Sequence, residues 1–245
     1  MNVELEKRKI SKIFVITLTL VVFLSGIGFF NILQDDRITI FNDQNKKSSK
    51  VTDLYLMVGP KHIPISAVER FKEYDINLEL SDEEKEQITP LEDFFTMGNR
   101  IPEDTEKFAK NPDEYRLTIT GNVENPTNFT YEQLLTNFEN KYILTELYCM
   151  PNLRGMGQFV GPKLYDVIRY TNPNDNATKI IVSAGDGYQW NYTLEEINEY
   201  KDDYILAMAM NGYPLAIEHG YPARLALPHE PGIKWVKWIV EIKLE

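Results

Sequence analysis

At 245 residues, the chain is long enough to bury a substantial hydrophobic core, and its length predicts one main domain with smaller additions. The formal net charge of −11 disfavours a nucleic-acid-binding protein, because lysine and arginine side chains would have to supply the phosphate contacts. The single cysteine excludes an internal disulfide, so the core must stabilise the fold.

Residues 13–33 carry no charged side chain and would form a helix long enough to span the ~30 Å hydrocarbon core of a bilayer. Basic residues in the segment 1–12 and aspartates after residue 33 predict a cytoplasmic N-terminus and a body on the extracytoplasmic side. We therefore expect a single-pass anchor in the cell membrane. A cleaved signal peptide is the alternative, although this apolar run is longer than a typical signal core and lacks a clear cleavage site.

Two segments separate the predicted anchor from the main domain. Residues 34–50 end in a polar stretch without apolar periodicity, which predicts a flexible linker. Residues 51–88 begin with the strand-like run "DLYLMVG", and Ser66 and Glu69 have the spacing of a capping box at the start of a helix. We expect a small ordered appendage here, and the sequence assigns it no role.

Residues 89–245 alternate strand patterns with short helical patterns. Thr130 and Gln133 have the spacing of a capping box before a short amphipathic helix, and the apolar run 142–148 predicts a buried strand. Apolar residues alternate over 236–244, which predicts one strand with a buried face. Strands outnumber helices, so the predicted fold class is α+β, with mixed sheets and short helices.

The only cysteine, Cys149, directly follows the predicted buried strand. Nearby Asn152, Arg154, Gly155 and Gly157 are typical of a loop rather than of the centre of a strand. A thiol in this setting can be a core residue, a nucleophile or a metal ligand, and cationic neighbours would stabilise the thiolate that attacks or ligates. The residues alone leave these three interpretations open.

Basic side chains gather later in the chain, among glycines and prolines. His219 and Arg224 lie in "NGYPLAIEHGYPARLALP", and Lys234 and Lys237 lie in "GIKWVKW". Glycine lets the backbone approach a ligand closely and arginine or lysine can hold phosphate, so an anion site is one interpretation. The other interpretation is that Arg224 and Lys237 lie on exposed strand faces and that His219 is a turn residue. Upstream, "SAGDGYQW" places a tight turn and Tyr188 after a buried strand, a common position for a ligand-contacting loop.

Taken together, these segments resemble the sulfite oxidase family, specifically its molybdopterin-binding oxidoreductase domain. The resemblance runs from about residue 89 to residue 245. Its motifs appear in the family's order: "TPLEDFFTMGNRIP", "YRLTITGNV", "TELYCMPNLRG", "GPKLYDVI", "SAGDGY", "NGYPLAIEHGYPARLALP" and "GIKWVKWIVEIKL".

The resemblance implies a molybdenum–molybdopterin cofactor, with tungsten as the alternative metal, and Cys149 as the protein's thiolate ligand to that metal. It implies oxygen-atom transfer to or from a small oxyanion, S-oxide or N-oxide, with Tyr188 facing the substrate. Arg224 is expected near the pterin phosphate, and Arg100 stands where the family often has histidine. The implied cofactor-binding residues are Asn99, Arg100, Cys149, Ser183, His219, Arg224, Lys234, Trp235 and Lys237.

The chain stops soon after the last predicted strand, so we expect neither the C-terminal immunoglobulin-like dimerisation domain of many family members nor a haem-binding segment. The resemblance to exported single-domain members implies a membrane-anchored monomer. It also implies a small-molecule substrate and a membrane haem protein or another electron-transfer partner.

Two other functions remain open from the sequence. Cys149 could be the nucleophile of a thiol-dependent hydrolase with His219 or His229 as general base, since such pairs are close in space rather than in sequence. A non-catalytic extracellular binding module with the same fold is the third hypothesis.

Overall fold

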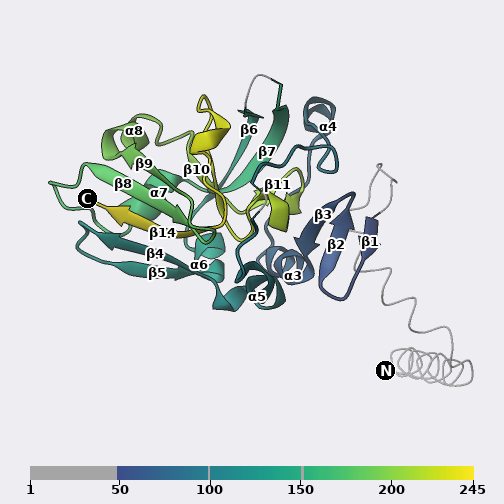
Figure 1. The fold of residues 1–245 in the computed structure, drawn as a ribbon, viewed down its shortest axis with the longest axis horizontal. Coiled ribbons are helices and arrows are strands. Elements are labelled where there is room, and N and C mark those ends of the chain that lie inside the picture. The colour runs from purple at the N-terminus through teal and green to yellow at the C-terminus, as the bar shows by residue number, and fades with distance from the viewer. Residues whose placement is uncertain (1–48, 99, 150–151) are drawn as a thin grey trace, which may run out of the picture. The chain divides into compact units, whose positions relative to one another are not determined.

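The computed structural model describes residues 49–98, 100–149 and 152–245 (Figure 1). No helix within these ranges combines the length and the apolar composition needed to cross a bilayer. The anchor predicted at residues 13–33 lies outside the described residues and stays a prediction, as does the role of Asn99.

A five-stranded sheet with the strand order β5-β4-β14-β8-β9 forms one part of the main domain (Figure 1). Its strands are β4 (Arg116–Gly121), β5 (Thr127–Thr130), β8 (Lys179–Ala184), β9 (Gln189–Thr193) and β14 (Ile239–Leu244). Strand β14 pairs parallel with β4 and antiparallel with β8, so the sheet is mixed, as expected for the predicted α+β class.

Two smaller sheets position Cys149 and Arg224 among the candidate site residues. The four-stranded sheet has the order β12-β11-β7-β6. It contains β6 (Asn140–Tyr148), β7 (Arg154–Pro162), β11 (Ala209–Met210) and β12 (Tyr213–Pro214). The two-stranded sheet pairs β10 (Ile205–Ala207) with β13 (Arg224–Ala226). Cys149 lies in the connection of the β6–β7 hairpin, where Tyr148 pairs with Arg154.

The helices of the main domain are short: α5 (Thr105–Lys110), α6 (Tyr131–Thr136), α7 (Leu164–Arg169) and α8 (Leu194–Glu199), with 3-10 turns η2 (Pro112–Glu114), η3 (Ile217–His219) and η4 (Gly232–Lys234). The capping box before α6 is confirmed, because the Gln133 N–H donates to the Thr130 hydroxyl at 3.1 Å and the Thr130 N–H donates to the Gln133 side chain at 2.9 Å.

The predicted strand over residues 236–244 is shorter than expected. Strand β14 begins at Ile239, because Trp238 adopts a left-handed backbone conformation with φ 51°. A bulge between Ile239 and Glu241 then shifts the alternation, so that Ile239 is fully buried and Val240 is partly exposed. Before this point the backbone pairs with another segment, since the Leu225 N–H of β13 donates to the Val236 carbonyl at 2.8 Å.

The appendage forms the antiparallel strands β1 (Ser49–Val51), β2 (Tyr55–Val58) and β3 (Lys61–Pro64), followed by helices α3 (Ile65–Glu73) and α4 (Asp82–Gln87). The predicted capping box at Ser66 is wrong, because Pro64 is the N-cap of α3 and no side chain caps the helix. Instead the Ser66 hydroxyl donates to the Ala109 carbonyl of α5 at 2.6 Å.

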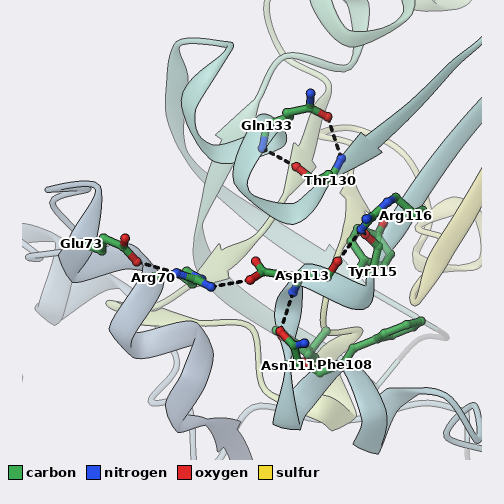
Figure 2. A network of polar contacts seen from close by, with 10 residues as sticks. Arg70, Glu73, Phe108, Asn111, Asp113, Tyr115, Arg116, Thr130 and Gln133 are labelled. Carbon is green, nitrogen blue, oxygen red and sulfur yellow. Dashed lines mark hydrogen bonds and ion pairs between the residues drawn. The ribbon is translucent and has the colours of Figure 1, made fainter.

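Polar contacts tie the appendage to the main domain around the end of α5. Figure 2 shows Arg70 of α3 between Glu73 of the same helix and Asp113 of η2, each at 2.6 Å. The Asn111 side chain accepts the Asp113 N–H at 3.1 Å and so orders the turn that presents Asp113. Helix α3 is therefore held against the main domain by directional contacts as well as by its buried face.

Candidate cofactor-binding site

Cys149 sits in the β6–β7 connection, and its side chain is partly exposed. Its N–H donates to the Leu153 carbonyl at 2.8 Å, which closes the loop just after β6. The cysteine is thus held at a defined position without being packed into the core, an arrangement that leaves the sulfur able to bind a ligand.

The η4 turn packs directly behind Cys149, and the contact requires glycine at position 232. A Cβ on Gly232 would lie 2.9 Å from the Tyr148 carbonyl oxygen and 3.2 Å from the Cys149 Cβ. Real Cβ atoms do not approach backbone so closely, so a larger residue would push the turn and the cysteine loop apart.

Tyr188 reaches the same place from the β8–β9 turn. Its hydroxyl donates to the Ile233 carbonyl of η4 at 2.7 Å. Burial raises the pKa of Tyr188, and the negative charges of Asp186 and Cys149 raise it further. Tyr188 therefore lies within electrostatic reach of Cys149, and three segments far apart in sequence meet here.

Arg224 at the start of β13 is 3% exposed. It donates to the His219 carbonyl at 3.0 Å, and its guanidinium lies over the rings of Phe159 and Trp235 at 5.6 and 5.7 Å. Burial lowers the pKa of Arg224 to about 9, so the side chain stays charged at neutral pH. None of the ion pairs in the described part of the chain involves this buried charge.

His219 ends the η3 turn and is 1% exposed. Its Nε2 atom has no hydrogen-bond partner among the described residues. Burial lowers the pKa of His219 well below its usual value, and the positive charges of Arg224, Lys61 and Lys237 lower it further. A neutral imidazole with a free ring nitrogen is costly to bury, so this atom indicates a missing partner.

Lys237 brings a further positive charge to His219 and Arg224. Its ammonium donates to the carbonyls of Met97 and Glu218 at 2.5 and 2.9 Å and lies 4.0 Å from the centre of the Trp238 ring. Burial, followed by the charge of Arg224, lowers the pKa of Lys237 to about 7. This lysine is therefore paired with carbonyl dipoles and a ring face and with no carboxylate in the described structure.

We call Lys61, His219, Arg224 and Lys237 the cationic cluster. Glu218 acts on Lys61 and Lys237 through its charge, but its carboxylate is hydrogen-bonded to His62. Buried charge without a partner destabilises a fold, so such a cluster is typical of a site that receives an anion. A phosphate could accept hydrogen bonds from each member.

The structure brings some of the predicted site residues together and leaves others apart. His219, Arg224, Trp235 and Lys237 meet around the cluster, whereas Cys149 and Tyr188 meet beside η4. The indole N–H of Trp235 donates to the Glu230 carbonyl at 3.0 Å, which fixes the ring over Arg224.

Lys234 does not join the cluster. Its ammonium is paired with Glu196 and Glu230, both at 2.9 Å, so its charge is neutralised within the protein. Ser183 lies in β8 opposite Gln189, and Arg100 is exposed. The pairing of Lys234 with Glu196 could not be predicted from the sequence, because the two residues are 38 positions apart, whereas Glu230 lies only four positions before Lys234.

Sequence reasoning also missed two residues. Lys61 belongs to the appendage, for which the sequence predicted no role, and its charge acts on His219. Phe94 packs its ring edge-on against His219, with 5.6 Å between the ring centres. A lysine flanked by strand residues carries no sign that it will be buried. Only the packing of β3 against the η3 turn reveals it.

The depressed pKa of Lys237 predicts a pH-dependent stability of the cofactor-free protein. Between pH 7 and about 10.5, the unfolded chain holds the proton of Lys237 while the folded chain loses it. The free energy of unfolding should therefore rise with pH in this window. The destabilisation that comes from burying the protonated Lys237 is fully present below pH 7. Lys237→Met should remove this rise, as measured by urea unfolding at several pH values, with Lys179→Met as control. Parallel pH curves for wild type and Lys237→Met would contradict the assignment.

A family model for the oxidoreductase molybdopterin binding domain matches residues 103–245. The NADPH nitrate reductase of Leptosphaeria maculans is 28% identical over 153 residues, which cover 53% of this chain and 17% of that protein. The mitochondrial sulfite oxidase of Drosophila melanogaster is 23% identical over 181 residues, which cover 64% of this chain and 31% of that protein. The chain therefore spans at most 31% of the length of these two relatives.

A solved structure gives a likeness in fold. The sulfane dehydrogenase SoxCD from Paracoccus pantotrophus superimposes with a TM-score of 0.55 and 22% sequence identity. The match covers 84% of this chain and 58% of that chain. It therefore extends beyond residues 103–245, the range that the family model matches.

Proposed function

Because this chain belongs to the family of oxidoreductase molybdopterin-binding domains, we propose that it transfers an oxygen atom to or from a small oxyanion, S-oxide or N-oxide. The family relationship makes it a molybdenum–molybdopterin-dependent oxidoreductase domain, and the resemblance to the sulfite oxidase family is confirmed. The substrate and the direction of the reaction are proposals, since the chain covers only part of its curated relatives.

The residues of the cationic cluster fit the anionic end of this cofactor. Arg224 is buried and charged at neutral pH, and Lys237, whose pKa is lowered to about 7, is half-buried. Neither side chain has a carboxylate partner in the described structure. The Nε2 atom of His219, buried and without a partner among the described residues, is the single observation that carries the proposal most directly. A phosphate would satisfy this atom and neutralise its cationic neighbours at the same time.

Cys149 would hold the metal through its thiolate. A soft sulfur ligand suits a metal that a sulfur-containing cofactor also binds. The bound cofactor supplies the two-electron redox chemistry. The protein orients it, with the Leu153 carbonyl and Gly232 fixing the cysteine loop from two sides.

Tyr188 would line the substrate side of the metal. Its hydroxyl donates to the Ile233 carbonyl, so the ring is fixed before substrate arrives. A fixed polar group beside the metal can orient a small oxygen-containing substrate without an entropic cost at the time of binding.

The hydrolase hypothesis finds no support in the described contacts. No hydrogen bond there joins Cys149 to His219 or His229, and His219 is buried beside Phe94 and the other members of the cationic cluster. A general base needs to be within hydrogen-bond reach of its nucleophile, directly or through one water.

The proposed function is tested with protein purified from a host that makes the cofactor. Reduced viologen would be offered with nitrate, S-oxides and N-oxides, and ferricyanide would be offered with sulfite. We expect turnover with one of these substrate classes that depends on the presence of Cys149. Bound cofactor without turnover in either direction would contradict the proposal and favour the non-catalytic binding module.

A further inference from the structure

The β2–β3 hairpin lies outside residues 103–245, the range that the family model matches, yet it contacts the cationic cluster. The His62 N–H donates to Glu218 Oε2 at 3.0 Å, and the His62 ring Nδ1 lies 2.5 Å from Glu218 Oε1. Glu218 is in the η3 turn and directly precedes His219. The hairpin is therefore attached to the turn that presents His219.

Lys61, at the start of β3, is 5% exposed. Its ammonium donates to the Phe94 carbonyl at 2.7 Å, and it forms no ion pair in the described structure. The Phe94 ring packs against His219, so one residue contacts both Lys61 and His219. The charge of Lys61 also acts on His219 and Lys237.

A buried ammonium with one carbonyl partner is incompletely satisfied. The group has three N–H donors, and the described contacts use one of them. Glu218 is close enough to act on Lys61 by its charge, but its carboxylate oxygens are engaged by His62. The remaining donors of Lys61 are therefore available to an anion that enters the cluster.

We propose that Lys61 is a binding residue for the phosphate of the cofactor, and that the His62–Glu218 contact attaches its hairpin to the η3 turn. The inference rests on the proposed function for the identity of the anion. It assigns to the appendage a place in the cofactor site. The alternative is a structural lysine whose only role is to hold the Phe94 carbonyl.

The test uses cofactor-free protein and inorganic phosphate, with chloride at matched ionic strength as reference. Phosphate should raise the unfolding temperature of the wild type, because a ligand that binds only the folded state stabilises it. Lys61→Met should bind phosphate about tenfold more weakly, the loss of one charge-assisted hydrogen bond. Lys85→Met, which removes an exposed lysine of the same N-terminal region paired with Asp82, should bind like wild type.

A second variant separates binding from structure. Lys61→Gln retains a donor for the Phe94 carbonyl but removes the charge, so it should fold and still lose phosphate affinity. Equal phosphate affinities of wild type, Lys61→Met and Lys61→Gln would overturn the inference. If Lys61→Met alone fails to fold, Lys61→Gln with wild-type affinity overturns it equally.

The same variants, made in a cofactor-competent host, distinguish this inference from the proposed function. Faster loss of pterin from Lys61→Gln than from Lys85→Met during dialysis would support the role of Lys61 in the holoprotein, and equal loss would overturn it. Wild-type protein without any pterin would overturn the proposed function. Phosphate binding through Lys61 would still establish the anion site in that case.

Discussion

Replacing Cys149 with serine will lower redox turnover by more than about 100-fold, while the protein keeps its fold and its pterin. Mutation of residues that hydrogen-bond to a metal ligand lowers metal affinity or activity about 10–100-fold. Removal of the ligand itself should lower activity by more than that. A serine hydroxyl is a hard ligand that stays protonated at neutral pH, so it cannot replace a thiolate. Cys149 is partly exposed, so little core packing is lost.

The measurement compares rates with artificial electron donors or acceptors, normalised to the pterin content of each preparation. Thr145→Ser, a similar change on β6, the strand that leads to the cysteine, serves as control and should retain wild-type rates. Pterin should remain in Cys149→Ser because the cationic cluster is intact. Wild-type turnover per bound pterin in Cys149→Ser would contradict the ligand role.

Replacing Arg224 with methionine will weaken cofactor binding by about 10–100-fold, which corresponds to the loss of one charge-assisted hydrogen bond worth about 1.5–3 kcal/mol. The stability of the cofactor-free protein should change little in comparison. A buried charge without a carboxylate partner destabilises the cofactor-free protein. The apolar methionine side chain, which is of similar length, can pack against Phe159 and Trp235.

The expected result is that Arg224→Met weakens cofactor binding but changes the stability of the cofactor-free protein little. Pterin retention and thermal unfolding would be measured for Arg224→Met, for Arg224→Lys and for the control Arg169→Met, which removes an exposed arginine at the end of α7. Arg224→Lys should bind the cofactor with intermediate strength, since it keeps the charge but loses the planar fork of donors. Arg224→Met that keeps its pterin as firmly as Arg169→Met would show that Arg224 does not bind the cofactor.

Local sequence signals predicted the fold where the deciding interactions are local. The capping box at Thr130 and Gln133 involves residues three positions apart and is confirmed. The capping box expected at Ser66 is wrong because a tertiary contact with the Ala109 carbonyl uses the hydroxyl, and Pro64 begins the helix instead. The same spacing thus gave opposite outcomes according to what packs beside it.

The last predicted strand shows why a regular apolar alternation does not fix where a strand begins. Its apolar pattern over residues 236–244 is regular, but Trp238 takes up a left-handed conformation, and its ring NH donates to the Ile217 carbonyl at 2.8 Å. That contact ties the segment before β14 to the η3 turn and places Lys237 beside Glu218 and the cluster. Periodicity describes which residues are buried, and it does not describe where a strand is interrupted.

The sequence predicted only those members of the candidate site that lie within recognisable motifs. His219 and Arg224 are five residues apart and meet as expected. Lys234 matches the same family pattern as Lys237, yet two carboxylates neutralise it. Lys61 comes from a segment with no recognised motif, and nothing short of the three-dimensional packing places it near His219.

We propose that the thiolate of Cys149 binds the metal of a pterin cofactor whose phosphate occupies the cationic cluster. X-ray absorption at the metal edge, with metal and pterin analysis, would test this on wild type and Cys149→Ala from a cofactor-competent host. We predict stoichiometric molybdenum or tungsten in the wild type and one fewer sulfur neighbour of the metal in the variant. Wild-type protein without metal or pterin, or an unchanged sulfur shell in Cys149→Ala, would contradict the claim.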